Sequence, residues 1–161
     1  MTPPQGKRPS PGQLVELDIG RIAPQGDMVS HWGRYVVFVE GGLPGEHVRA
    51  RMVRIETNHG RARVDQVQSA SGDRISAPCP VFLKCGGCRF QHALPEAQRR
   101  FKADILKQAL KRDVPMKAGS PPYRYRTKAQ PRIRISRGRA VLALQERESH
   151  RLVDTPDCLL Y

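Results

Sequence analysis

The sequence of 161 residues has no uninterrupted apolar run of about 18 residues, the length that a membrane-spanning helix needs. Its start, MTPPQGKRPSPGQ, also lacks the apolar core of a secretory signal peptide, and its proline, glycine and charge predict a disordered leader over residues 1–12. These absences predict a cytoplasmic protein with no membrane partner. In the reducing cytoplasm, clustered cysteines are more often metal ligands than disulfides.

Acidic residues are scarce, since 28 Lys and Arg stand against 15 Asp and Glu and give a formal net charge of +13. The excess is uneven: residues 99–151 contain 16 basic and 4 acidic side chains, whereas the rest of the chain contains 12 and 11. A basic segment of this kind attracts a polyanion. Nucleic acid is the commonest such partner and an anionic membrane surface comes second, so we expect a nucleic-acid partner rather than a membrane.

The first half of the sequence has the pattern of short β-strands. Alternating or β-branched residues predict strands at 13–19, 34–40, 46–56 and 61–68, with turns between them and one slip in the alternation at Met52–Val53. Short strands at nearly regular spacing predict a small all-β barrel over residues 13–68. Residues 69–78 then form a linker.

The second half predicts one helix and one hairpin. A helix is expected over residues 95–112, because Pro95 suits a first turn and apolar residues recur every four positions from Ala97. From Tyr123 onward a basic β-hairpin is expected, turning near Gly138, with Pro131 restricting the first strand to a sheet edge. The predicted class is therefore mainly β, of α+β type.

Four cysteines are the only thiols: Cys79, Cys85 and Cys88 form a C-x5-C-x2-C motif, and Cys158 follows 70 positions later. Four thiolates can hold zinc or a 4Fe-4S cluster. Structural zinc usually draws on two Cys pairs, and this chain has one pair and two single cysteines, which favours a cluster. Gly86 and Gly87 lack side chains, so the backbone can approach a bulky cofactor closely. Zinc and unliganded cysteines remain as alternatives.

Four segments carry a family resemblance: CPVFLKCGGCRFQH, the helix, YRYRTKAQPRI and SHRLVDTPDC. They resemble the N-terminal part of the iron-sulfur RNA (uracil-C5)-methyltransferases that modify 23S ribosomal RNA. VVFVEGGLPGEHVRARMV resembles the centre of that family's TRAM domain, an OB-like barrel that binds RNA. The resemblance spans Leu14 to Cys158, and one departure is Leu159, where a proline commonly follows the last ligand.

This resemblance implies a ligand set and a domain division. By position it implies that Cys79, Cys85, Cys88 and Cys158 bind a 4Fe-4S cluster. It also implies a TRAM barrel over residues 13–68 and an iron-sulfur and partial central RNA-binding domain over residues 79–161, with ribosomal RNA as the partner.

The catalytic part of that family has no counterpart in the sequence. Such enzymes use a nucleophilic cysteine and an α/β domain that binds S-adenosylmethionine. If all four cysteines are ligands, none remains to attack, and the chain has no Gly-x-Gly motif and no βαβ alternation after the cluster. We therefore expect no catalytic residue here. The expected protein is truncated or split before its catalytic domain and inactive alone, with S-adenosylmethionine binding only in a complete enzyme and a separate catalytic chain as a candidate partner.

A row of basic residues is the candidate RNA contact. If residues 123–135 form one strand, the even-numbered positions share a face that could follow a phosphate backbone, while Ile133 and Ile135 face inward. That row consists of Arg124, Arg126, Lys128, Arg132 and Arg134. A solvated strand face is the structural alternative. At the level of the whole chain, the alternatives are a non-catalytic zinc-binding nucleic-acid adaptor and a free-standing TRAM RNA-binding protein.

Overall fold

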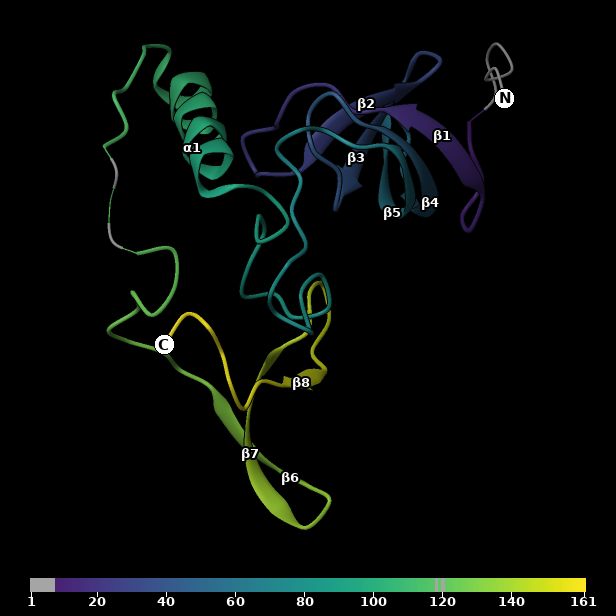
Figure 1. The fold of residues 1–161 in the computed structure, drawn as a ribbon. Helices are drawn as coiled ribbons and strands as arrows, with labels where there is room; N and C mark the ends of the chain where they lie inside the picture. The colour runs from purple at the N-terminus through teal and green to yellow at the C-terminus, as the bar shows by residue number, and fades with distance from the viewer. Residues whose placement is uncertain (1–7, 118, 120) are drawn as a thin grey trace. The chain divides into compact units, whose positions relative to one another are not determined.

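The computed structural model describes residues 8–161 except 118 and 120, so residues 1–7 of the predicted leader lie outside the described part. Two compact units make up the chain (Figure 1). The barrel unit contains the residues up to Arg74 together with Glu96–Met116, and the cysteine unit contains Ile75–Pro95 and Lys117–Tyr161. The predicted division placed the helix with the cysteine segment, whereas here it groups with the barrel.

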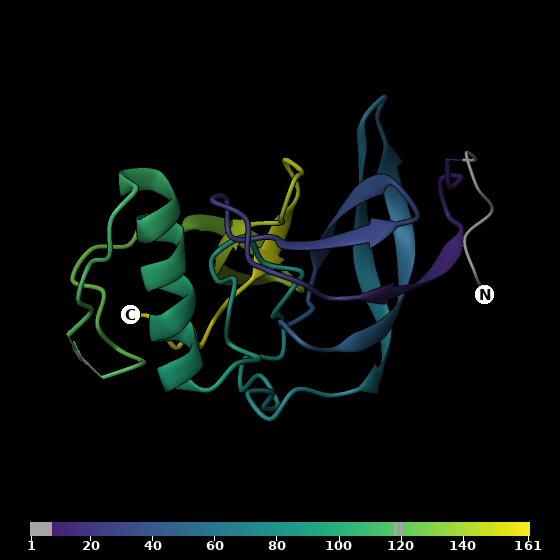
Figure 2. The same ribbon diagram turned by 90° about the horizontal axis from the view of Figure 1, so that it is seen from above.

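A five-stranded sheet forms most of the barrel unit, and its strands lie side by side in Figure 1 and in the turned view of Figure 2. The strands are β1 (Leu14–Asp18), β2 (Met28–Trp32), β3 (Tyr35–Glu40), β4 (His47–Ile55) and β5 (His59–Ser69). Their order is β1-β4-β5-β3-β2, and β3 and β5 form the parallel pair. The two edge strands, β1 and β2, are connected through Val29 on β2. The Val29 carbonyl accepts a hydrogen bond from the Gly20 amide at 2.9 Å, and the Val29 amide donates to the Arg21 carbonyl, both just after β1.

Alternating side chains of these strands form the barrel core. The apolar residues of these strands exposed by no more than 4% are Val15, Leu17, Met28, Val37, Val39, Val48, Ala50, Met52 and Ala62. The pairing of β4 with β5 shifts register between Met52 and Arg54, at the slip that the sequence predicted. Gly12, the last residue of the predicted leader, donates its amide hydrogen to the Met52 carbonyl at 2.7 Å.

The helix α1 (Pro95–Leu110) is two residues shorter than predicted. Ala97 and Phe101 are buried, and the side-chain amide of Gln108 donates to the Ile22 carbonyl at 3.0 Å. Leu110 is 52% exposed, so the apolar stripe is buried only in the first half of the helix. No helix in the described ranges combines the length and the hydropathy that crossing a bilayer would demand.

The cysteine unit contains a three-stranded antiparallel sheet in the order β6-β7-β8. Its strands are β6 (Arg132–Ser136), β7 (Arg139–Gln145) and β8 (Leu152–Asp154). Ser136 pairs with Arg139, and both turn residues have positive φ, 51° at Arg137 and 74° at Gly138. These values are typical of a two-residue type I′ hairpin turn, which confirms the predicted turn. The edge position of β6, after Pro131, was also predicted.

Two expectations about this hairpin are wrong. The first strand does not run from Tyr123, because β6 begins at Arg132 and residues 121–131 contain no strand. Pro131 has no amide hydrogen for a ladder, and the amides of Arg124 and Arg126 donate instead to the carbonyls of Leu159 and Leu160. Ile133 and Ile135 do not face inward either, since they are 72% and 71% exposed.

Candidate cysteine site and basic surface

The loop that carries the first three cysteines is a series of tight turns attached to the end of β7. Within it, the Phe82 amide donates to the Cys79 carbonyl at 3.1 Å and the Cys85 amide to the Val81 carbonyl at 2.9 Å. Cys85 forms a β-bridge with Glu146, and the Gly86 amide donates to the Gln145 carbonyl at 3.0 Å. The backbone of β7 therefore fixes where this loop lies.

The same sheet brings the distant cysteine to the loop. Cys158 follows β8 by four residues, and β8 pairs with β7 through Leu144 and Val153. All four cysteines line one cavity of about 120 Å³, together with apolar residues that include Leu144, Pro156 and Leu160. The structure thus gathers side chains that lie up to 79 positions apart in the sequence.

Hydrogen bonds and burial act in opposite directions on these thiols. Burial raises the pKa of Cys85, the Gly87 amide at 3.4 Å lowers it, and the neighbouring sulfurs of Cys79 and Cys158 raise it further. Burial also raises the pKa of Cys88, and a hydrogen bond from the Gln91 side-chain amide at 3.1 Å lowers it. A positive centre beside Cys85 and Cys88 would favour their thiolate forms and so oppose the effects of burial and of the neighbouring sulfurs.

No disulfide links these cysteines, all four of which are free. Among the described residues, no group of three or more His, Cys, Asp or Glu side chains is arranged to hold a metal ion. The four thiols therefore share a cavity without forming a ready coordination sphere for a single ion. The predicted ligand set stays a prediction.

The predicted row of basic residues is only partly assembled. Arg132 and Arg134 share one face of β6, and Arg134 pairs with Asp154 at 2.6 Å. Arg124 donates through Nη1 to the main-chain oxygen of Tyr161 at 2.6 Å. Arg126 and Lys128 are exposed in the irregular segment before β6 and do not continue its face.

One basic residue of this surface was missed. Arg139 begins β7 opposite Ser136, so it lies on the same face of the hairpin as Arg132 and Arg134. The sequence could have predicted this position of Arg139, because a two-residue turn at 137–138 places residue 139 opposite residue 136. Within the described part of the chain, Arg132 and Arg139 make no ion pair, and both are exposed. We call Arg132, Arg134 and Arg139 the hairpin arginines.

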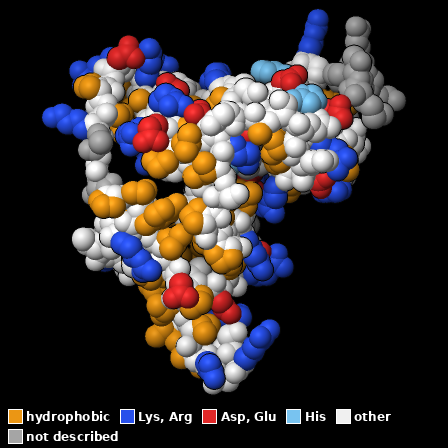
Figure 3. Space-filling model, viewed as in Figure 1, with side chains coloured by type: hydrophobic (Ala, Val, Ile, Leu, Met, Phe, Trp, Pro, Cys, Tyr) orange, Lys and Arg blue, Asp and Glu red, His pale blue; other side chains and the backbone are white. Residues whose placement is uncertain are grey.

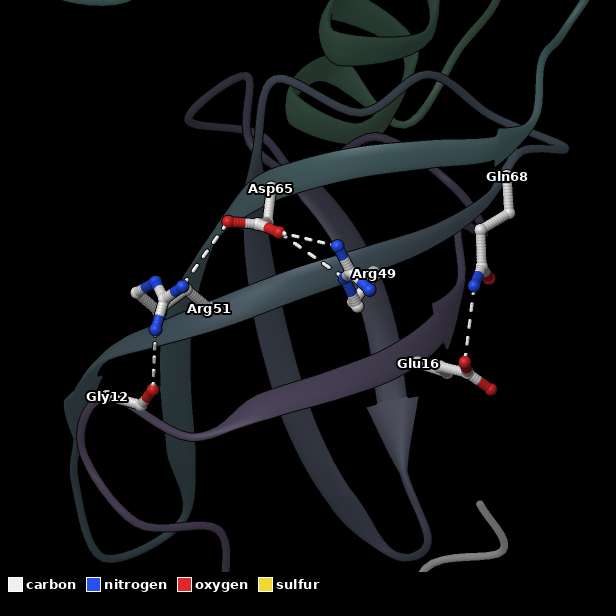
Figure 4. A network of polar contacts seen from close by, with 6 residues as sticks. All are labelled: Gly12, Glu16, Arg49, Arg51, Asp65 and Gln68. Carbon is white, nitrogen blue, oxygen red and sulfur yellow. Dashed lines mark hydrogen bonds and ion pairs between the residues drawn. The ribbon is translucent and has the colours of Figure 1, made fainter.

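The arginines of the barrel strands are paired with carboxylates instead. Asp65 on β5 accepts from Arg49 at 3.2 Å and from Arg51 at 3.4 Å, and Arg51 also donates to the Gly12 carbonyl at 3.2 Å (Figure 4). Beside them, Gln68 donates to Glu16 at 3.2 Å. Further pairs are Arg54 with Glu56, Arg61 with Asp27 and Arg63 with Glu40. Much of the positive charge on this sheet is thus locally balanced.

Comparison with known proteins gives both a domain and relatives. Residues 10–64 match the TRAM domain family. Proteins named as RNA methyltransferases are similar to the chain over 92% of its length: one from Halalkalibacterium halodurans at 35% identity over 159 residues, one from Listeria monocytogenes at 33% over 156, and one from Enterococcus faecalis at 34% over 159. The chain covers 34%, 34% and 35% of these three relatives.

A solved structure shares the fold. The tRNA (uracil-54, C5)-methyltransferase of Pyrococcus abyssi, solved in complex with S-adenosyl-L-homocysteine, superposes with a TM-score of 0.59 at 20% identity, over 90% of this chain and 32% of that one. The chain spans about a third of the length of the proteins it matches. It contains a TRAM domain and is homologous, over nearly all of its own length, to part of proteins named as RNA methyltransferases.

Proposed function

We propose that this chain is the RNA-binding part of an RNA (uracil-C5)-methyltransferase that acts on ribosomal RNA in the cytoplasm, and that its four cysteines hold a 4Fe-4S cluster. The observation that carries the proposal is the meeting of four free thiols in one cavity, in a chain that also contains a TRAM domain. The similarity to proteins named as RNA methyltransferases supports the choice of reaction class.

The donor groups of the cavity support the choice of an iron-sulfur cluster. Four cysteine sulfurs are the usual donor set of a 4Fe-4S cluster, and backbone or side-chain N–H groups directed at sulfur stabilise its negative charge. Here the Gly87 amide and the Gln91 side chain point at the sulfurs of Cys85 and Cys88. Zinc is the alternative occupant of four thiolates. A tetrahedral zinc ion would require the four sulfurs to lie within about 4 Å of one another. When bound, the cluster would join the 79–88 loop to the segment after β8, a structural role.

The chain's own residues would bind and orient RNA. The cysteine unit contains 12 Lys and Arg against 4 Asp and Glu, a net charge of +8, and the barrel unit contains 16 against 11, a net charge of +5. Cationic side chains on exposed strands attract the phosphate backbone. The hairpin arginines and the segment with Arg124, Arg126 and Lys128 supply such side chains. Methyl transfer from S-adenosylmethionine would belong to other parts of a complete enzyme, and we assign no catalytic residue to this chain.

Iron and acid-labile sulfide, measured after anaerobic purification, test the cluster. We expect about four of each per chain and a brown protein. Cys85→Ser should lose most of the iron, whereas Asp157→Asn, a change in the same cavity that leaves every thiol in place, should keep it. A colourless protein with about one zinc per chain would replace the cluster by a zinc site. A protein with neither metal would leave the cysteines without a ligand role.

RNA binding is tested by fluorescence anisotropy with a ribosomal RNA fragment and a transfer RNA of similar length. We expect tighter binding to the ribosomal fragment and an affinity that falls steeply with salt. Equal affinity for both RNAs would remove the ribosomal assignment. Binding that does not depend on salt would contradict the role given to the basic residues.

A further inference from the structure

The hairpin of β6 and β7 has an exposed apolar face opposite its arginines. Ile133 pairs with Leu142 across the hairpin, and Ile135 lies two positions along the same strand, so the three side chains project to one side. Their exposed fractions are 72% for Ile133, 71% for Ile135 and 36% for Leu142. Hydrophobic side chains gather along one side of the hairpin at the bottom of Figure 3. We call Ile133, Ile135 and Leu142 the outer apolar face.

The inner end of the same face is covered. Leu144 and Val153 pair across β7 and β8 and lie on the side of the sheet that carries Leu142. Val153 is only 5% exposed, and Leu144 lines the cysteine cavity beside Gly87. The loop of the cysteine unit therefore buries one end of a continuous apolar surface and leaves the other end bare.

The sequence of β6, RIRIS, has the alternation of a strand that buries one face. A hairpin with its apolar face in water is marginally stable, and adjacent exposed aliphatic side chains mark a contact surface. RNA is a poor occupant for this side, because Ile and Leu offer nothing to phosphate. The arginines that could bind RNA point to the opposite side.

The curated relatives suggest the occupant. They match 92% of this chain, yet the chain covers only 34% to 35% of their length, so about two thirds of each relative has no counterpart among these 161 residues. We propose that the outer apolar face packs against a further segment of an RNA methyltransferase polypeptide, one that presents aliphatic side chains. The proposal depends on the proposed function for this choice of occupant, but not on iron or on RNA binding.

Hydrogen exchange tests the contact without any substitution. The chain is compared alone and as a chimera in which it replaces the matching third of the Halalkalibacterium halodurans relative. We expect the amides of residues 132–136 to exchange about tenfold more slowly, or slower still, in the chimera, because the covered hairpin opens less often. Equal exchange of these amides in both proteins would overturn the proposal, whatever the iron content or RNA affinity.

A paired substitution identifies the surface. Ile133→Lys with Ile135→Lys should lower the Tm of the chimera by several degrees and leave the Tm of the chain alone nearly unchanged, since the face is exposed there. Arg132→Lys with Arg139→Lys, on the other side of the same hairpin and without ion pairs to lose among the described residues, is the control and should leave the Tm of both proteins unchanged. If instead the chain alone is a dimer by light scattering and the isoleucine changes make it a monomer, the occupant is a second copy and the proposal is wrong. A chimera whose Tm does not change with the isoleucine substitutions would also refute the proposal.

Discussion

Glu46 is a fully buried carboxylate that connects three segments of the barrel unit. Its oxygens accept hydrogen bonds from Arg74 at 2.5 and 2.7 Å, from the Leu43 amide at 2.8 Å and from the Ser71 amide at 3.2 Å. Arg74 also donates to the Gly41 carbonyl at 2.8 Å. Burial by itself would raise the pKa of Glu46, but these donors outweigh it and hold the pKa below its ordinary value of 4.5.

Replacing this carboxylate should be costly at neutral pH. We expect Glu46→Gln to lower the free energy of unfolding by about 3 kcal/mol at pH 7, because Arg74 loses its charged partner in a buried setting. Since the pKa is lower in the folded state, this stabilisation is present above the unfolded pKa and disappears as the pH falls through the folded pKa. Urea unfolding at neutral pH and at a series of pH values decreasing from 4.5 measures both effects.

The control for Glu46 is Asp65→Asn, which removes a carboxylate that bridges Arg49 and Arg51 on the exposed side of the sheet. Exposed ion pairs contribute little, so a loss of less than about 1 kcal/mol is expected. Equal losses in the two variants would mean that burial does not decide the strength of these pairs.

Gln91 is the side chain that we expect to tune the proposed cluster. It is 7% exposed, lines the cysteine cavity and donates to Cys88 Sγ at 3.1 Å. Hydrogen bonds to ligand sulfur stabilise the more negative, reduced form of a cluster. Gln91→Leu should therefore lower the reduction potential measured by an EPR-monitored redox titration, while the iron content stays the same.

Gln68→Leu is the matched control for this change. Its amide donates to Glu16 on the barrel (Figure 4), so its loss should leave the potential as it is. A potential that is the same in wild type and Gln91→Leu would show that this hydrogen bond does not tune the cluster. Absence of iron in the wild type would refute the cluster itself, which is a separate result.

Among the strands, β5 passes close to its neighbours at Gly60. A Cβ atom placed there would lie 2.8 Å from Met52 Cε, 3.0 Å from Tyr35 Cε1 and 3.1 Å from the Arg54 carbonyl oxygen. Met52 and Tyr35 are both core residues, and the backbone oxygen cannot rotate away. The absence of a side chain at this position allows the strands to pack.

Gly60→Ala should consequently destabilise the barrel by about 1 to 3 kcal/mol, the usual cost of an overpacked core. Gly72→Ala is the matched control, because nothing lies within 4 Å of its added Cβ and its φ is outside the left-handed region. Thermal unfolding followed by circular dichroism compares the two. If both variants melt together with the wild type, the core accommodates the extra methyl group and the packing argument fails.

The strands that could be predicted are those in which apolar or β-branched residues occupy the buried positions. Segments such as RYVVFVE alternate or carry β-branched residues throughout, and β3 lies within that segment. β2 was missed because Ser30 occupies a buried position, where its hydroxyl donates to the Asp18 carbonyl at 2.7 Å. β8 was missed because its three residues become a strand only by pairing with β7.

The candidate site could likewise be predicted from local sequence patterns but not where it depends on long-range contacts. The spacing of Cys79, Cys85 and Cys88 is local and indicates a shared site. The position of Cys158 depends on the pairing of β7 with β8, and that of the loop on its hydrogen bonds to residues 145–147. The tyrosines and arginines of residues 123–131 predict a strand by composition. The long-range bonds of Arg124 and Arg126 to Leu159 and Leu160 decide otherwise.

Across the whole chain, positive charge and ion pairing are divided unequally. The helix carries part of the basic stretch 99–151, yet it groups with the barrel, whose strands pair many of their arginines with carboxylates. The cysteine unit has 12 basic and 4 acidic residues and so cannot balance its charge internally. An arginine already paired with a carboxylate gains less from a phosphate than one that is solvated, because the first contact must be given up or shared.

This difference predicts where the proposed affinity for RNA depends most on charge. Arg132→Ala with Arg139→Ala should reduce the slope of log K against log salt by about 1.5, since each lost phosphate contact contributes about 0.7 to 0.9. Arg49→Ala with Arg51→Ala removes the same formal charge but leaves Asp65 unpaired, and should change the slope by less than half as much. Anisotropy titrations at several salt concentrations measure both slopes. A larger change in the barrel variant would place the main electrostatic contact with RNA on the TRAM domain rather than on the hairpin.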